Sequence, residues 1–137
     1  MKWPYTLAVI AYCALIFWLS SQPISVPPAL DIPHLDKAVH VMIYGVLAAL
    51  VSVGMYRSGK NYTFRVQFYV PWAFATFYGI TDEIHQLYVP GRHFEWLDIA
   101  ANMTGAYLAQ LFLCYVWWRL HKQGPVESMQ LQSSEAD

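Results

Sequence analysis

The stretch TDEIHQLYVPGRHFEWLDIAAN, residues 81–102, decides how the rest of this sequence is interpreted. It carries four carboxylates, two histidines and one arginine, and strongly apolar sequence lies on both sides of it. If the apolar flanks cross a bilayer, the stretch connects two membrane spans and its acidic residues lie at the ends of those spans. Ionisable side chains inside a span are costly, so they suggest a functional site.

The composition indicates a membrane protein. Of 137 residues, 57% are hydrophobic and only 12% are charged, against roughly 25% charged in ordinary soluble domains. Because about 20 helical residues cross the roughly 30 Å hydrocarbon core, we predict four spans, at about residues 4–20, 37–56, 66–88 and 97–118. The third span is long enough only if its helix continues through the acidic residues, and Pro90 with Gly91 then ends it. The predicted fold class is all-α, a polytopic membrane bundle of four transmembrane helices.

The two ends of the chain differ in character. Lys2 and the apolar run after it resemble a signal peptide, but the run is rich in Trp and Tyr and lacks a clean cleavage site, so we predict a retained first span. Residues 123–137 are polar and lack periodicity, which predicts a disordered tail. The domain organisation predicted is therefore a transmembrane domain over residues 1–122 followed by this tail.

The distribution of charge predicts the orientation. Six of the eight Lys and Arg residues fall in the N-terminus, the second loop and the tail, which four spans place on one side. The opposite side has only Lys37 and Arg92, with six of the nine acidic residues and four of the five histidines. The positive-inside rule then places both termini in the cytoplasm and the acidic cluster on the extracytoplasmic side.

Polar residues occur in pairs four positions apart near the outer ends of three spans. Residues at this spacing share one helix face, so three such faces at one depth are predicted to converge on a single polar pocket. Glu83 adds a further carboxylate beside one of these pairs. The pairs are Asp36 with His40, Asp82 with Gln86, and Asp98 with Asn102.

Each pair also has a plainer explanation. Asp36 or Asp98 at the start of a helix is typical of a cap or of a first-turn acid. His40 and Asn102 are typical of hydrogen bonds between membrane helices. Two carboxylates at the end of the third span oppose its helix dipole, and we predict Arg92 as their partner.

Small residues predict which helices touch. Gly45 and Ala49 in the second span, and Ala101, Gly105 and Ala109 in the fourth, recur at four-residue intervals. Such intervals allow membrane helices to approach closely. Contact between these two helices would bring the polar pairs at their outer ends together.

The order of these motifs resembles the VanZ-like family of small membrane proteins over roughly residues 34–110. The motifs are DKAVH at 36–40 followed by Tyr44, TDEIHQ at 81–86, VPGR at 89–92, and Asp98 with Asn102. The resemblance implies several spans in a bacterial inner membrane and, for the founding member, a link to glycopeptide (teicoplanin) resistance, without a settled biochemical activity. The residues that match the family pattern are Asp36, Lys37, His40, Tyr44, Asp82, Glu83, Gln86, Arg92, Asp98, Asn102 and Gly105.

Three classes of function remain open. We favour binding of a cell-envelope precursor or lipid headgroup at the outer leaflet. The alternatives are an enzyme that acts on a lipid-linked envelope substrate by acid/base chemistry, and a structural or protein-interaction bundle held by an ion-pair network. The candidate catalytic residues are Asp82, Glu83, Asp98 and His40. The candidate binding residues are Asp36, Lys37, His40, Tyr44, Asp82, Glu83, Gln86, Arg92, Asp98 and Asn102.

The acidic residues and histidines of the predicted pocket also bear on whether the protein binds a metal ion. The carboxylates outnumber the nearby cations, and Asp, Glu and His are suitable metal ligands. No HExxH or comparable signature is present, so no metal site and no cofactor are predicted. The predicted partners are the lipid bilayer and a lipid-linked precursor. No basic stripe lies beside the aromatic residues, so nucleic-acid binding is not predicted.

Overall fold

The computed structural model describes residues 1–23 and 35–134, and every regular element within them is a helix. The four helices are α1 (Trp3–Ser20), α2 (Leu35–Tyr56), α3 (Phe64–Gln86) and α4 (Trp96–Ser134). No described residue forms a strand. The prediction of an all-α fold with four helices is confirmed.

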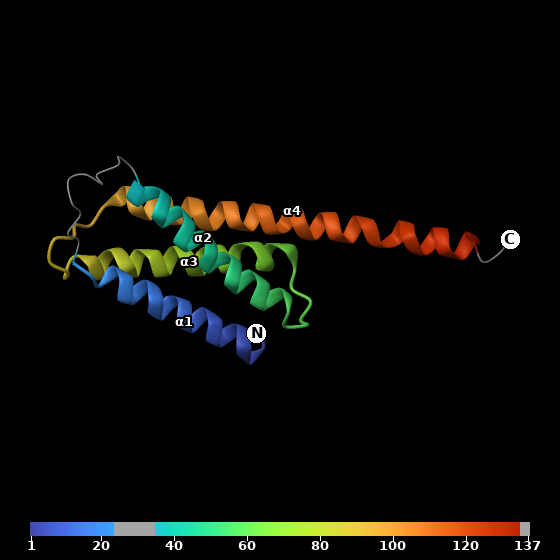
Figure 1. The fold of residues 1–137 in the computed structure, drawn as a ribbon, viewed down its shortest axis with the longest axis horizontal. Helices are drawn as coiled ribbons and strands as arrows, with labels where there is room; N and C mark the ends of the chain where they lie inside the picture. The colour runs from blue at the N-terminus through green and yellow to red at the C-terminus, as the bar shows by residue number, and fades with distance from the viewer. Residues whose placement is uncertain (24–34, 135–137) are drawn as a thin grey trace.

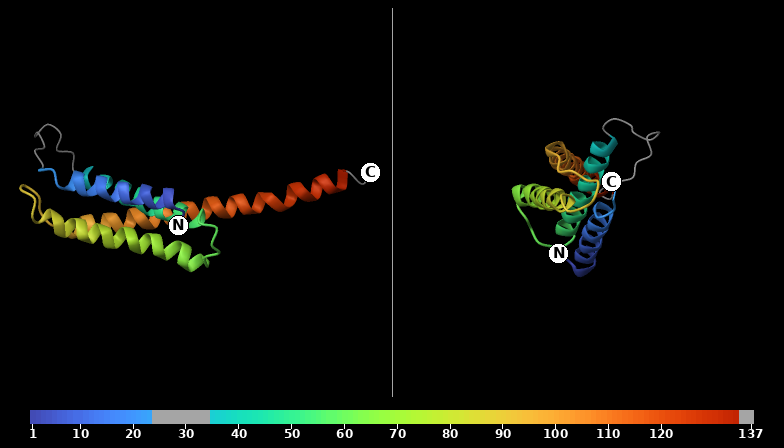
Figure 2. Two further views of the ribbon diagram at one scale, coloured as in Figure 1. Left: turned by 90° about the horizontal axis from the view of Figure 1, so that it is seen from below. Right: turned by 90° about the vertical axis from the view of Figure 1, so that its left-hand side faces the viewer.

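The helices run alternately in opposite directions (Figure 1). Residues 87–95 lie at one end of the bundle with the start of α2, and residues 57–63 lie at the other end with the N-terminus. We call the first of these the acidic end; it holds the last turns of α1 and α3 and the first turns of α2 and α4. Figure 2 shows the same alternation and shows α4 continuing past the other end of the bundle.

Three helices are long and apolar enough to cross a membrane: α1, α2 and residues Trp96–Leu120 of α4. The chain is therefore described as a membrane protein. Helix α3 has 23 residues, or about 35 Å at 1.5 Å per residue, which is sufficient length. Its last turns carry Asp82, Glu83 and Gln86, and α3 is not among the three helices that are both long and apolar enough to cross a membrane. Its role as a fourth span stays a prediction.

Local sequence accounts for the limits of α3. The side chain of Thr63 accepts a hydrogen bond from the backbone N–H of Val66 and caps the first turn. Pro71 lies within the helix without ending it. The helix ends at Gln86, and Gly91 then adopts a φ of 79°, a conformation that glycine reaches without steric cost. The acidic residues are therefore helical, as predicted.

The C-terminal part of α4 differs from the prediction. The fourth helix was expected to end near residue 118, and residues 123–137 were expected to be disordered. Instead α4 continues to Ser134, although its apolar part ends at Leu120. Gly124 and Pro125 lie inside this extension, and both are unfavourable within a helix. Helix propensity therefore does not account for the continuation to Ser134.

The closest helix contact joins α2 and α4. A Cβ atom built on Gly105 would lie 2.0 Å from the carbonyl oxygen of Val41, and one built on Gly45 would lie 3.2 Å from the carbonyl oxygen of Gly105 and 3.9 Å from Cβ of Ala109. The predicted contact through small residues is confirmed. It fixes how the first turns of these two helices face each other, and therefore positions the polar residues at the acidic end.

Candidate functional site

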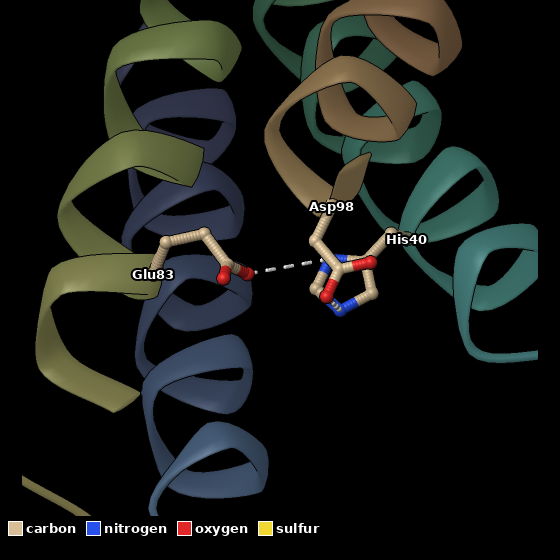
Figure 3. Close-up of side chains that lie close together, drawn as sticks. All are labelled: His40, Glu83 and Asp98. Carbon is tan, nitrogen blue, oxygen red and sulfur yellow. Dashed lines mark ion pairs between the residues drawn. The ribbon is translucent and has the colours of Figure 1, made fainter. Parts of the chain in front are cut away.

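His40, Glu83 and Asp98 meet at the acidic end. They come from α2, α3 and α4, and their side chains point toward one another (Figure 3). Nδ1 of His40 lies 3.9 Å from Oε1 of Glu83, and Nε2 of His40 lies 4.0 Å from Oδ2 of Asp98. Glu83 is 0% exposed and Asp98 is 6% exposed. One residue from each predicted polar face therefore contributes to this cluster.

Glu83 is held on one side only. Its Oε2 accepts a hydrogen bond of 3.3 Å from the backbone N–H of Glu95, in the segment just before α4. Its Oε1 is buried and has no hydrogen-bond partner among the described residues. Buried polar atoms in folded proteins nearly always have a partner, so this oxygen is unusual.

Asp82, the neighbour of Glu83 in the chain, accepts two hydrogen bonds through one of its carboxylate oxygens. Its Oδ2 accepts hydrogen bonds from the hydroxyl of Tyr44 at 2.9 Å and from Nε2 of Gln86 at 3.3 Å. Tyr44 is itself buried in α2, so the first of these bonds ties α2 to α3. The spacing of Asp82 and Gln86 thus places both on one face, and that face meets α2.

His40 and Asn102 form one of the polar links between α2 and α4. Nδ1 of His40 lies 2.9 Å from Oδ1 of Asn102. Asn102 fits because α3 has Gly79 opposite it: a Cβ on Gly79 would lie 2.7 Å from Nδ2 of Asn102 and 3.1 Å from Cε1 of Tyr44. Sequence reasoning missed Gly79, although Ala75 and Gly79 form a small-residue pair at the same four-residue interval as those in the second and fourth spans.

Lys37 is the cation of a second acidic group, which shares Asp98 with the cluster. Its Nζ lies 2.8 Å from Oδ2 of Asp36, 2.5 Å from Oε2 of Glu95 and 2.6 Å from Oδ1 of Asp98. The side chains of Asp36 and Glu95 are 58% and 50% exposed. Asp36 therefore contacts Lys37 at the surface and does not face His40 within a pocket. Glu95 was not a candidate residue; its only sequence signal was its place among the four carboxylates of residues 81–102.

The predicted ion pair of Arg92 is wrong. Arg92 was expected to pair with Asp82 and Glu83, but it forms no ion pair with any acidic residue that the structure describes. Its Nε and Nη2 donate instead to the carbonyl oxygens of Gln22 and Leu19, at 3.1 and 3.2 Å. The last carbonyls of a helix lack intrahelical partners and favour a positive charge, so the end of α1 attracts Arg92.

A pocket of about 250 Å³ lies between α1, α2 and α3 at the acidic end. Apolar residues of α1 and α2 form part of the wall, and its polar lining is Ser20, His40, Tyr44, Asp82, Gln86 and Arg92.

The remaining candidates do not line this pocket. Glu83, Asp98 and Asn102 are absent from its lining residues, and they contact His40 instead. His85 is also directed elsewhere, since its ring stacks on Phe17 with 4.5 Å between centroids. Spacing predicted a single pocket, but the structure has two separate features, a pocket and a cluster, and His40 belongs to both.

Comparison with known proteins agrees with the motifs. The family model described as VanZ/LLP1 matches residues 5–119, which extends beyond the stretch that the motifs cover. No curated protein and no solved structure matches the chain. Because the match includes α1, α2, α3 and nearly all of the apolar part of α4, the chain belongs to the VanZ/LLP1 family.

Proposed function

We propose that this protein binds the phosphate-bearing headgroup of a membrane lipid, or of a lipid-linked cell-envelope precursor, in the pocket between α1, α2 and α3. The observation that carries the proposal is the two-sided lining of the pocket. Ile16, Leu19 and Ile43 provide apolar surface, whereas Asp82 and Arg92 provide charge. An amphiphile offers both kinds of surface within a single molecule.

The size of the pocket favours a headgroup over a whole precursor. Its volume is about 250 Å³, whereas pockets that enclose drug-sized ligands have roughly 300–1,000 Å³. A phosphate with a small substituent fits this space, and the hydrocarbon chain of the ligand would lie along the helices in the bilayer.

Arg92 is the group that would recognise phosphate. The guanidinium group has five N–H donors in a planar fork, and the two hydrogen bonds to α1 leave others for a ligand. Arginine and phosphate form charge-assisted, often bidentate, hydrogen bonds. The bonds to Leu19 and Gln22 would hold the side chain in place before the ligand arrives, which lowers the entropy cost of binding.

Binding is tested with the purified full-length protein in nanodiscs, using phosphatidylethanolamine, phosphatidylglycerol and a polyprenyl phosphate as separate probes. Arg92→Lys keeps the charge but loses the planar fork. We expect it to weaken binding of the preferred probe about tenfold, which corresponds to the loss of roughly 1.4 kcal/mol. Arg57→Lys, at the opposite end of the bundle, is the matched control. Equal affinities for the two variants and the unmodified protein would contradict the proposal.

The location is part of the same proposal: the bacterial inner membrane, with the acidic end on the extracytoplasmic side. Lys2, Arg57, Lys60 and Arg65 lie toward the opposite end, and the positive-inside rule assigns that end to the cytoplasm. Reporter fusions after residues 60 and 122 are expected to report cytoplasm, and a fusion after residue 92 the periplasm or exterior. A cytoplasmic signal after residue 92 would reverse the orientation and remove the site from the outer leaflet.

We extend the proposal to a role in glycopeptide (teicoplanin) resistance, which the resemblance to the founding member suggests. Asp82→Asn removes a charge from the pocket with little change in volume, so it is expected to alter teicoplanin sensitivity while membrane abundance stays near that of the unmodified protein. The alternative of a structural role rests on Lys37, which joins α2 to α4 and to Glu95. A fall of abundance in proportion to the phenotype would support that alternative.

A further inference from the structure

We propose that His40, Glu83 and Asp98 form a binding site for a divalent metal ion of the Zn²⁺ or Mn²⁺ type. No local sequence motif predicts such a site, because its three residues come from three different helices. The inference does not depend on headgroup binding. It concerns the cluster on the other side of His40 from the pocket.

The geometry of the cluster is the first support. One potential ligand atom from each of His40, Glu83 and Asp98 lies within 4.8 Å of the others. Zinc ligands of this kind lie about 2.0–2.2 Å from the ion, so three ligands around one ion are at most about 3.8 Å from one another. A movement of up to about 0.6 Å by each ligand atom would therefore bring all three to bonding distance.

The unpartnered oxygen of Glu83 is the second support. Oε1 belongs to a residue that is 0% exposed, has no hydrogen bond among the described residues and points toward His40. Burying a carboxylate oxygen without a partner costs free energy. A cation at the centre of the cluster would satisfy it.

A second acidic group at the same end already has a cation, whereas Glu83 has none from Lys or Arg among the described side chains. Asp36, Glu95 and Asp98 also converge closely enough to hold an ion. The ammonium group of Lys37 already lies within ion-pair distance of all three carboxylates. By contrast, no Lys or Arg in residues 1–23 or 35–120 forms an ion pair with Glu83. Of the two groups, the one that contains His40 is therefore the candidate.

The contact between His40 and Asn102 suits a metal ligand. If Nδ1 carries the proton and donates it to Oδ1 of Asn102, which lies 2.9 Å away, Nε2 presents its lone pair on the side of Asp98. Glu83 approaches the ring nearest Nδ1, so its carboxylate would turn toward Nε2 to share the ion. Metal-binding histidines usually donate their other ring N–H in this way, which fixes the ring and the tautomer. One imidazole with two carboxylates suits Zn²⁺ or Mn²⁺ better than Ca²⁺, which takes oxygen ligands.

The test uses the full-length protein in detergent, stripped with a chelator and titrated calorimetrically with Zn²⁺ or Mn²⁺. The unmodified protein is expected to bind about one ion per chain. Glu83→Gln removes a metal ligand. Loss of a group that only hydrogen-bonds a ligand lowers metal affinity roughly 10- to 100-fold, so the metal affinity of Glu83→Gln should fall by at least this much. Glu95→Gln removes a charge from the group that Lys37 fills, and its affinity should stay within about threefold of the unmodified value. Equal loss in both variants, or no binding by the unmodified protein, would overturn the proposal.

A spectroscopic measurement covers the case in which Glu83→Gln does not fold. Mn²⁺ bound to the unmodified protein should show coupling to a histidine nitrogen by pulsed electron paramagnetic resonance. Without that coupling, His40 is not a ligand and the proposed site is wrong. If the coupling is present, His40→Gln should abolish it. The ring of His85 stacks on Phe17 in α1, away from the cluster, so His85→Gln should retain the coupling.

Discussion

Replacing Gly105 by alanine is expected to destabilise the bundle more than any other glycine-to-alanine change in its helices. The added Cβ would lie 2.0 Å from the carbonyl oxygen of Val41 and 2.7 Å from its Cα. These are backbone atoms of α2, so they move only if the helix moves. Overpacking costs about 1–3 kcal/mol and occasionally more, and we expect Gly105→Ala to reach at least about 3 kcal/mol.

Two other glycines provide matched controls for this prediction. At Gly45 the nearest obstacle lies at 3.2 Å, so Gly45→Ala should be intermediate. At Gly54 the nearest atom is the terminal methyl of Met1, a flexible group at 2.7 Å, and Cβ of Tyr5 follows at 3.1 Å. Alanine favours a helix over glycine by about 1 kcal/mol, a gain that the contact with Tyr5 opposes, so Gly54→Ala should be close to neutral. The free energy of unfolding in mixed detergent measures the series, and equal stability of Gly105→Ala and Gly54→Ala would contradict the packing.

Replacing Lys37 by methionine is expected to have the second largest effect. The change leaves three carboxylates without their shared cation, and Asp98 among them is buried. Removing one partner of a buried ion pair costs about 3–5 kcal/mol. The Lys37 side chain is 18% exposed and two of its partners are about half exposed, so we expect the lower end, about 3 kcal/mol.

A double variant separates loss of the charge pair from loss of packing. Asp98→Asn in the Lys37→Met background removes the stranded charge, so it should recover part of the lost stability. Lys60→Met, at the exposed opposite end, is the matched control and should change the unfolding free energy by less than about 0.5 kcal/mol. If Lys37→Met behaved like Lys60→Met, the lysine would not be the cation that holds this end together.

Much of the architecture could be predicted because it depends on local sequence. Apolar runs of sufficient length identified the helices, and Pro90 with Gly91 marked the turn after α3. The small residues around Gly45 and Gly105 predicted which helices touch, since close approach requires the absence of side chains. The end of α4 was not predicted, because the polar composition of residues 123–137 and the pair Gly124 and Pro125 both argue against a helix there.

The candidate site was predicted only in part. Four-residue spacing correctly placed Asp82 with Gln86 on one helix face, and it brought His40 and Asn102 to the same end of the bundle. Spacing within a helix does not give the rotation of one helix relative to its neighbours. That rotation divided the predicted pocket into a pocket beside Asp82 and a cluster around Glu83, both of which include His40.

The sequence by itself determined which residues gather at the acidic end, because the order and length of the helices set their depth. Only the tertiary structure decided which of them pair. Arg92 bonds to carbonyl oxygens at the end of α1, whereas Asp82 and Glu83 accept hydrogen bonds from Tyr44 and from the backbone of Glu95. Lys37 pairs with a different set of carboxylates, those of Asp36, Glu95 and Asp98. The physical reason is that a long charged side chain reaches several partners from one backbone position. The choice among them depends on helices and helix-end carbonyls that are distant in the sequence.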